Sequence, residues 1–410
     1  MKTLMLFVLT LSLAAFARAG ANLSAETRLP VDERSAHEPA AAFGAGKYLV
    51  VWRAGRNENA DLVGVRLDAA GKVLDAKPFV ISKGADVQEQ PAVAFGGGNF
   101  LVVWADLRSL KDYNVRAARV SPDGKVLDPD GVVVCAEPTN QCAPDVAFDG
   151  AKFVVVWQDF RNGKEQMGSG LSRLGHTYET FATYISPAGQ VSDPKGIPVL
   201  TGSTHMFPAV VARSAGEALV ASERGFGLFC GKVLGKKEIA PYPGKRAGSK
   251  GRRKVTLAAA SSRDNYLIIG GIFQPIGRGG NPTGKEGTFI VDAAGKITKT
   301  IGLTAKKLGV FRPDAAWDGS NYVVAWGFVE GGKWAGTSST RQWDAVYASR
   351  IAKDGKVLEE KIDLGGSFES PIRLPALASD GKGTTLVAYE RHPKTADVPI
   401  KIAFRLLRAK

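Results

Sequence analysis

The hydrophobic residues of this chain fall into short runs that recur along its length, with about 50 to 60 residues between copies. The three clearest copies are Tyr48-Leu-Val-Val-Trp52, Phe100-Leu-Val-Val-Trp104 and Phe153-Val-Val-Val-Trp157. Four weaker copies open at Ala218, Tyr266, Tyr322 and Thr385. Because the clear runs are apolar at every position, both faces of each strand must be buried. The chain therefore contains seven copies of one unit.

Each copy predicts four antiparallel strands. A short apolar strand follows a proline, as at Pro39 and Pro91, and a turn that contains glycine leads into the fully apolar strand. The third strand alternates, as in Val115–Val120, and a hairpin turn such as Ser121-Pro-Asp-Gly124 leads to a weaker fourth strand. Four-stranded sheets that stack face to face are the blades of a propeller. The predicted fold class is all-β: a seven-bladed β-propeller of four-stranded antiparallel blades.

The two ends of the chain predict how the ring closes. The seventh copy stops after its third strand, at Ile400–Phe404, and residues 28–38 precede the first copy. A propeller joins its first and last blades so that no sheet edge stays open. We therefore expect residues 28–38 to supply an N-terminal strand that completes the last blade. Residues 20–410 then form a single domain, with blades starting near residues 39, 91, 144, 208, 255, 313 and 375.

The N-terminus predicts export. Lys2 precedes the apolar run Thr3–Ala17, and the small residues around Arg18 fit a cleavage site, so residues 1–19 have the pattern of a Sec signal peptide. The run is shorter than the roughly 20 apolar residues of a membrane-spanning helix. The first cysteine is Cys135, so a lipoprotein is not expected. The expected localisation is secreted or periplasmic.

The cysteines and histidines predict little chemistry. Cys135 and Cys142 flank a short polar loop, and in an exported protein we expect them to form a disulfide. Cys230 lies in an apolar stretch and is expected to be a buried thiol. The four histidines lack the spacing of metal ligands, so neither a metal nor a cofactor is expected.

A polar motif follows the apolar strand, as in Trp104-Ala-Asp106-Leu-Arg108 and Trp157-Gln-Asp159-Phe-Arg161. Its recurrence favours a structural role, in which the ion pair ties a blade to its loop or neighbour. The alternative is a ring of arginines that holds an anionic ligand. With these motifs the sequence resembles exported bacterial propeller proteins built from a proline, apolar, Asp-Gly, Tyr-Leu-Val-Val-Trp-x-Asp-x-Arg repeat, over residues 28–407. The resemblance implies an architecture and no particular activity.

Three insertions interrupt the repeat between the second and third strands, at residues 162–180, 274–285 and 330–342. Loops on this face of a propeller commonly carry function. Tryptophans beside arginine and carboxylates suit a glycan site, and the alternative is that they pack over the blade rim. The candidate ligand-binding residues are Trp334, Trp343, Arg341, Asp344, Arg173, Tyr178, Arg108 and Arg161.

The chain has a net charge of +14, which favours acidic partners without specifying one. A basic run between the fourth and fifth copies is the best candidate for contact with a polyanion, and the alternative is a solvated loop. The residues of this run are Lys245, Arg246, Lys250, Arg252, Arg253 and Lys254.

Together these features predict a secreted or cell-envelope binding propeller that recognises a glycan or another anionic surface ligand on its long-loop face. No catalytic residue is assigned, because a Gly-x-Ser-x-Gly elbow and a phosphate loop are both missing from the sequence. Two alternatives stay open: a carbohydrate-active hydrolase or lyase, and a scaffold that recruits another envelope protein. We expect a monomer, with no specific nucleic-acid contact and no membrane span.

Overall fold

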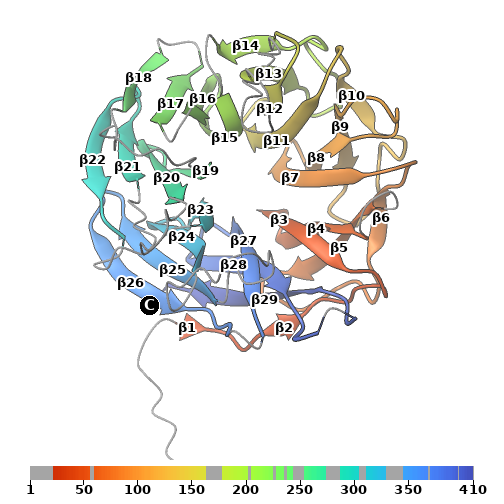
Figure 1. Ribbon diagram of the computed structural model, residues 1–410. Coiled ribbons are helices and arrows are strands. Elements are labelled where there is room, and N and C mark those ends of the chain that lie inside the picture. The colour runs from red at the N-terminus through yellow and green to blue at the C-terminus, as the bar shows by residue number, and fades with distance from the viewer. Residues whose placement is uncertain are drawn as a thin grey trace, which may run out of the picture.

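The computed structural model shows a ring of antiparallel β-sheets around a central axis, the arrangement of a β-propeller (Figure 1). Every regular element among the described residues is a β-strand. The predicted signal peptide lies outside these residues. The structure describes residues 22–55, 60–162, 178–201, 205–224, 228–234, 238–242, 254–273, 287–303, 311–328, 345–367, 370–395 and 397–409.

Six sheets have four strands each, and in each sheet the first strand lies nearest the axis (Figure 1). The first three of these sheets are β3 (Ala36–Gly44), β4 (Lys47–Ala54), β5 (Asp61–Asp68) and β6 (Phe79–Ser82); β7 (Gln88–Gly96), β8 (Asn99–Asp106), β9 (Asn114–Val120) and β10 (Val132–Cys135); and β11 (Gln141–Phe148), β12 (Phe153–Asp159), β13 (Glu179–Ile185) and β14 (Ile197–Leu200). The other three are β15 (His205–Ser214), β16 (Glu217–Arg224), β17 (Leu228–Val233) and β18 (Glu238–Tyr242); β19 (Lys254–Ser261), β20 (Asn265–Phe273), β21 (Gly287–Asp292) and β22 (Ile297–Ile301); and β23 (Phe311–Trp317), β24 (Asn321–Phe328), β25 (Ala345–Ala352) and β26 (Val357–Asp363).

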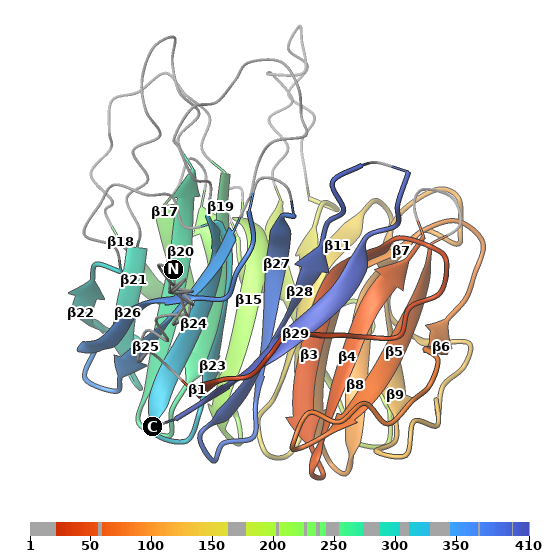
Figure 2. The same cartoon turned by 90° about the horizontal axis from the view of Figure 1, so that it is seen from below.

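The remaining sheet, called the closing sheet below, joins the two ends of the chain. It contains β27 (Ile372–Ser379), β28 (Thr384–Arg391) and β29 (Lys401–Arg408), and both β1 (Asn22–Leu23) and β2 (Thr27–Arg28) pair with β29. β27 and β28 lie beside β3, so the last part of the chain meets the first (Figure 2). The prediction of seven four-stranded blades is therefore wrong: six blades have four strands, and the closing sheet has five.

The edge of the closing sheet is split because Ser24 interrupts the ladder between β1 and β2. Ser24 donates its backbone N–H to Leu406 O, but the N–H of Leu406 is accepted by the Ser24 hydroxyl instead of a backbone carbonyl, both at 2.9 Å. Pairing then resumes at β2. The sequence predicts a single closing strand over residues 28–38, whereas the paired residues lie at 22–23 and 27–28.

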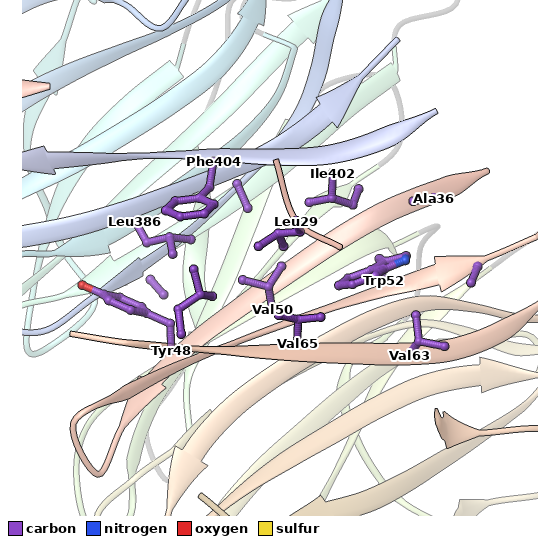
Figure 3. Packing of buried hydrophobic residues seen from close by; sticks show 14 of the residues in the cluster. Leu29, Ala36, Tyr48, Val50, Trp52, Val63, Val65, Leu386, Ile402 and Phe404 are labelled. Atoms are coloured by element: carbon purple, nitrogen blue, oxygen red, sulfur yellow. The ribbon is translucent and has the colours of Figure 1, made fainter. Parts of the chain in front are cut away.

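The second strand of each sheet is buried on both faces, as the apolar runs predict. Tyr48, Val50 and Trp52 of β4 pack against the closing sheet, where Phe404 of β29 meets them (Figure 3). The alternate residues of β4 pack in the opposite direction, against β8. Burial of a large apolar side chain stabilises the fold by about 1.5–3 kcal/mol, so every sheet depends on a neighbour on each side.

Neighbouring sheets approach most closely at the hairpin between their first and second strands. A Cβ atom added to Gly44 would lie 1.9 Å from Cγ of Phe95, and one added to Gly96 would lie 2.1 Å from Cγ of Phe148. A larger residue at either position would push the two sheets apart, so this contact requires glycine.

Two aspartates connect inner strands across the boundary between sheets. Asp145 accepts the N–H of Val210 in the next sheet at 2.7 Å, and Asp314 accepts the N–H of Leu377 at 2.6 Å. Burial raises the pKa of Asp145 to about 6 and that of Asp314 to about 7, although the backbone N–H groups act in the opposite direction. Both aspartates therefore stabilise the ring by accepting backbone hydrogen bonds, while their burial favours the protonated, neutral form of each side chain.

The N-terminal segment is fastened to the closing sheet by a buried ion pair. Glu26 lies between β1 and β2, and its carboxylate accepts Arg391 Nη2 at 2.8 Å and the Tyr389 hydroxyl at 2.8 Å. About a fifth or less of either charged side chain is exposed. This contact, called the clasp below, lies at the C-terminal end of β28 and holds the chain ends together.

We predict that Glu26→Gln lowers the free energy of unfolding by about 1–3 kcal/mol, because Arg391 keeps its charge but loses its charged acceptor. Urea denaturation followed by circular dichroism measures the change. Glu33→Gln is the matched control, since Glu33 lies in the same segment and is exposed. Equal stability of the two variants would show that the clasp does not hold the ring closed.

Candidate functional site

The face of the ring on which the inner strands begin is called the mouth below. Because adjacent strands are antiparallel, the second strands end and the third strands begin at the same face. The segments that join β12 to β13, β20 to β21 and β24 to β25 therefore connect at the mouth, as the sequence predicts for its three insertions. The central parts of these segments lie outside the described residues.

The inner strand bulges at the residue before its proline in six of the sheets. The φ angle of that residue lies between 41° and 55°, and the register against the second strand shifts at the same point. Such a backbone is strained for a residue with a side chain, and it is retained where the surroundings enforce it. The six residues are Glu38, Gln90, Ala143, Phe207, Arg312 and Leu374.

Side chains from the preceding sheets hold several of these bulges. Glu390 Oε1 accepts the N–H of Glu38 at 2.9 Å, and Glu38 Oε2 accepts the N–H of Gln90 at 3.0 Å. Gln90 Oε1 then accepts the N–H of Ala143 at 2.7 Å. A continuous series of hydrogen bonds thus runs around part of the mouth, from the closing sheet through the first two sheets to β11.

Charged and titratable side chains gather along this series, on the first two sheets and the closing sheet. We call them the mouth cluster: His37, Glu38, Arg53, Glu89, Tyr113, Glu390 and His392. They come from the starts of β3 and β7, the ends of β4 and β28, and the residues beside β9 and β28.

Glu390 is the buried centre of one half of the mouth cluster. Its Oε2 lies 2.6 Å from His392 Nε2, and its Oε1 lies 3.6 Å from His37 Nδ1. Burial alone would raise the pKa of Glu390, but the nearby imidazoles of His37 and His392 and the hydrogen bond from the Glu38 backbone lower it to about 2. Glu390 is therefore ionised and orients both histidines, each of which keeps 14% of its side chain exposed.

Arg53 lies in the other half and contacts two carboxylates loosely. Its Nε is 3.5 Å from Glu38 Oε2, and its Nη1 is 3.9 Å from Glu89 Oε2. Burial and the charge of Glu38 raise the pKa of Glu89. Burial and the carboxylate of Glu89, to which the phenol is hydrogen-bonded, raise the pKa of Tyr113 to about 12. Tyr113 therefore keeps its proton at neutral pH.

The arginines of the repeated motif have different surroundings. Arg108 binds both oxygens of Asp106, at 2.7 and 2.8 Å, and also reaches Asp130 O and the hydroxyl of Ser82 in the preceding sheet. Trp104 Nε1 donates to the same carboxylate at 2.7 Å. A ligand would have to displace these contacts. The motif thus ties neighbouring sheets together at their outer strands.

Arg161 repeats this arrangement with Asp159, and it explains the state of Cys135. Arg161 Nη2 lies 2.6 Å from Asp159 Oδ2 and 3.2 Å from Cys135 Sγ, the thiol taking the place that the Ser82 hydroxyl has in the previous copy. Cys142 instead lies 3.6 Å from Gln158 Nε2. Both cysteines are free, so the predicted disulfide is not formed. Each sulfur is held by a different partner: Cys135 by a residue of the next sheet, and Cys142 by its cross-strand neighbour in the same sheet.

Most of the remaining predicted site residues lie outside the described part of the chain. Tyr178 is described: its ring packs against Phe160 with centroids 5.2 Å apart, and burial raises its pKa. Lys254 begins β19, but its side chain is outside the description. The predicted residues with no described position are Trp334, Trp343, Arg341, Asp344, Arg173, Lys245, Arg246, Lys250, Arg252 and Arg253.

Sequence reasoning missed the mouth cluster because its members come from segments far apart in the chain. The sequence did contain a signal: some residues differ from the repeat at positions that the fold brings together. Arg53 stands where the next copies have Ala105 and Gln158, and Glu390 stands at the same place in the closing sheet. The position varies in charge among the sheets, with Glu223 in the fourth, so the architecture alone does not require a charged residue there.

Among the residues that the structure describes, no group of three histidine, cysteine or carboxylate side chains is arranged to hold a metal ion. Within the same ranges, no helix is long and apolar enough to cross a membrane.

Comparison with known proteins shows the fold alone. No protein-family model matches the sequence, and no curated protein matches it. Among solved structures, the polysaccharide lyase Uly1 aligns with 91% of this chain and 90% of its own, at 9% identity and a TM-score of 0.55. A mutant Trypanosoma rangeli sialidase displaying trans-sialidase activity aligns with 95% of this chain and 60% of its own, at 11% identity and a TM-score of 0.47. The catalytic domain of a Coprinopsis cinerea GH62 α-L-arabinofuranosidase aligns with 92% of each chain, at 9% identity and a TM-score of 0.41.

The lowered pKa of Glu390 predicts a specific loss of stability in acid. Its ionised form stabilises the folded protein above its ordinary pKa of 4.5, and this contribution is lost as the pH falls through about 2. Glu390→Gln should therefore flatten the decrease in the free energy of unfolding between pH 4.5 and 2, by about 3 kcal/mol. Urea denaturation at a series of pH values measures this, with Glu33→Gln as the control. An unchanged pH dependence would contradict the assignment.

Proposed function

We propose that this protein binds an anionic glycan at the mouth cluster. The observation that carries the proposal is the unsaturated guanidinium of Arg53. Unlike Arg108 and Arg161, Arg53 has only long carboxylate contacts within the described residues, at 3.5 and 3.9 Å, and its buried Nε makes no hydrogen bond there. The side chain keeps 17% of its surface exposed, so a ligand that reaches the rest of the guanidinium can supply a charged acceptor.

The groups around Arg53 suit the rest of a sugar residue. Tyr113, His37 and His392 supply an aromatic ring and polar ring atoms, and Glu38 supplies a carboxylate that accepts hydrogen bonds from hydroxyl groups. The net charge of +14 favours a polyanion over a neutral polymer. A solved protein with the same fold is described as a polysaccharide lyase, which supports a polysaccharide as the class of ligand.

Several sequence predictions extend this proposal beyond the described residues. Trp334 and Trp343 are proposed to stack on sugar rings next to the mouth cluster, and the basic run at residues 245–254 is proposed to contact further anionic groups of the polymer. We also propose that the protein acts as a monomer after export, in the periplasm or outside the cell. A protein scaffold is the competing function, and it predicts no affinity for glycans.

Arg53→Gln is predicted to weaken binding of an acidic polysaccharide by about tenfold or more, because a charged hydrogen bond contributes about 1.5 kcal/mol or more. Isothermal titration with hyaluronan, alginate and polygalacturonate measures the affinity. Arg263→Gln is the matched control, since it removes the same charge from an exposed position in the turn between β19 and β20, on the opposite face. Equal affinities of the two variants, or no affinity in the wild type, would exclude a glycan site at Arg53.

The double variant Trp334→Ala, Trp343→Ala is predicted to weaken glycan binding by about 30-fold, because stacking of a sugar on an aromatic ring contributes about 1 kcal/mol per ring. A glycan array with the purified protein makes the comparison. Binding indifferent to both changes would remove the tryptophans from the site and leave the role of Arg53 to be judged by its own variant.

A further inference from the structure

Several side chains of the mouth cluster can accept or donate a proton, a property that binding alone does not require. Two imidazoles share one ionised carboxylate, and a phenol is hydrogen-bonded to a second carboxylate. Pairs of this kind, in which a carboxylate orients an acid or base, are typical of general acid–base sites. All of these groups keep part of their surface exposed at the mouth except Glu390, which is nearly buried.

The hydrogen bond between His392 and Glu390 defines the basic atom of the imidazole. An ionised carboxylate only accepts hydrogen bonds, so His392 Nε2, at 2.6 Å from Glu390 Oε2, must carry a proton. In the neutral imidazole the lone pair then lies on Nδ1. His392 is therefore oriented to accept a proton at Nδ1 while Glu390 stabilises the resulting charge.

Arg53 lies between the histidines and Tyr113 in the network of contacts. It reaches Glu38, whose backbone N–H binds Glu390, and it reaches Glu89, which is hydrogen-bonded to Tyr113. Through these contacts Arg53 is connected to an imidazole base in one direction and to a phenol in the other. A cation for the substrate carboxylate, a base and a proton donor are the groups that removal of a proton next to a carboxylate uses.

We propose that the mouth cluster catalyses β-elimination on the bound glycan, with a uronic acid as the substrate unit; this proposal rests on the proposed function. His392 Nδ1 takes the proton from C5, next to the carboxylate that Arg53 binds. The C5–H electron pair forms the C4–C5 double bond, the C4–O bond breaks, and the leaving oxygen takes the proton of Tyr113. Solvent then removes the proton from His392 and returns one to Tyr113, so the reaction consumes no water and changes no oxidation state.

The occupancy of the carboxylates favours elimination over hydrolysis. A glycosidase needs one carboxylic acid and a second carboxylate that is free to act on water or the sugar. Here Glu390 is bound to two imidazoles and a backbone N–H, and Glu38 accepts the N–H of Gln90. Glu89 is hydrogen-bonded to Tyr113. Each of the three carboxylates of the mouth cluster therefore has a structural partner already.

The test measures product formation and polymer affinity separately, and it uses the full chain. Hyaluronan, alginate and polygalacturonate are each incubated with the wild type, and the ultraviolet absorbance of the unsaturated uronate is followed beside the number of new reducing ends. We expect both to rise together for at least one polymer. In His392→Ala and Tyr113→Phe the rate should fall about 100-fold or more while the affinity stays within a few-fold. Lys125→Ala, at an exposed turn on the opposite face, should match the wild type.

The outcomes separate the two proposals. Failure of every polymer to bind overturns the proposed function and the elimination with it. Binding without unsaturated product overturns the elimination and leaves the binding function standing. Saturated products with new reducing ends would show hydrolysis instead. Tyr113→Phe loses one hydroxyl and retains the ring, so unchanged turnover in this variant together with unchanged turnover in His392→Ala would also overturn the assigned roles.

Discussion

The whole structure depends on the burial of the second strand of each sheet on both of its faces. Tyr48, Val50 and Trp52 face one neighbouring sheet while Leu49 and Val51 face the other, so neither neighbour can be removed without exposing a large apolar surface. Only a closed ring gives every sheet two neighbours. The chain ends must therefore meet, and the clasp of Glu26 with Arg391 and Tyr389 supports the pairing of β1 and β2 with β29 that joins them.

Ring closure also explains why inter-sheet contacts repeat while the chemistry does not. Contacts such as Gly44 against Phe95, or Arg108 against Ser82, recur at the next boundary because the repeated strands bring equivalent positions together. The clasp is a version of this motif with the charges exchanged. In the closing sheet, Arg391 occupies the position that Asp106 occupies in the sheet of β8. The carboxylate that pairs with Arg391 is that of Glu26, in the N-terminal segment.

The sequence predicted individual strands and their burial well where a single segment carries the signal, although the predicted seven four-stranded blades were wrong. Apolar runs such as Phe100 to Trp104 report two-sided burial by themselves, and the prolines mark where each inner strand bulges. The details of closure were predicted less well, because a hydroxyl of Ser24 that replaces a backbone acceptor leaves no pattern in the sequence. The expected disulfide failed for a similar reason: spacing brings Cys135 and Cys142 close along the chain, but Arg161 and Gln158 engage the sulfurs separately.

The candidate site was hidden because it exists only in the closed ring. Glu390 belongs to the last sheet, and the N–H group that it accepts belongs to Glu38 in the first, so the hydrogen bond crosses the boundary where the chain ends meet. His37 and His392 approach the same carboxylate from the two sides of this boundary. Among the charged groups of the mouth cluster, Glu390 stabilises closure of the ring. Arg53 keeps guanidinium N–H groups without a close acceptor among the described residues, so the same cluster can serve both the fold and a ligand.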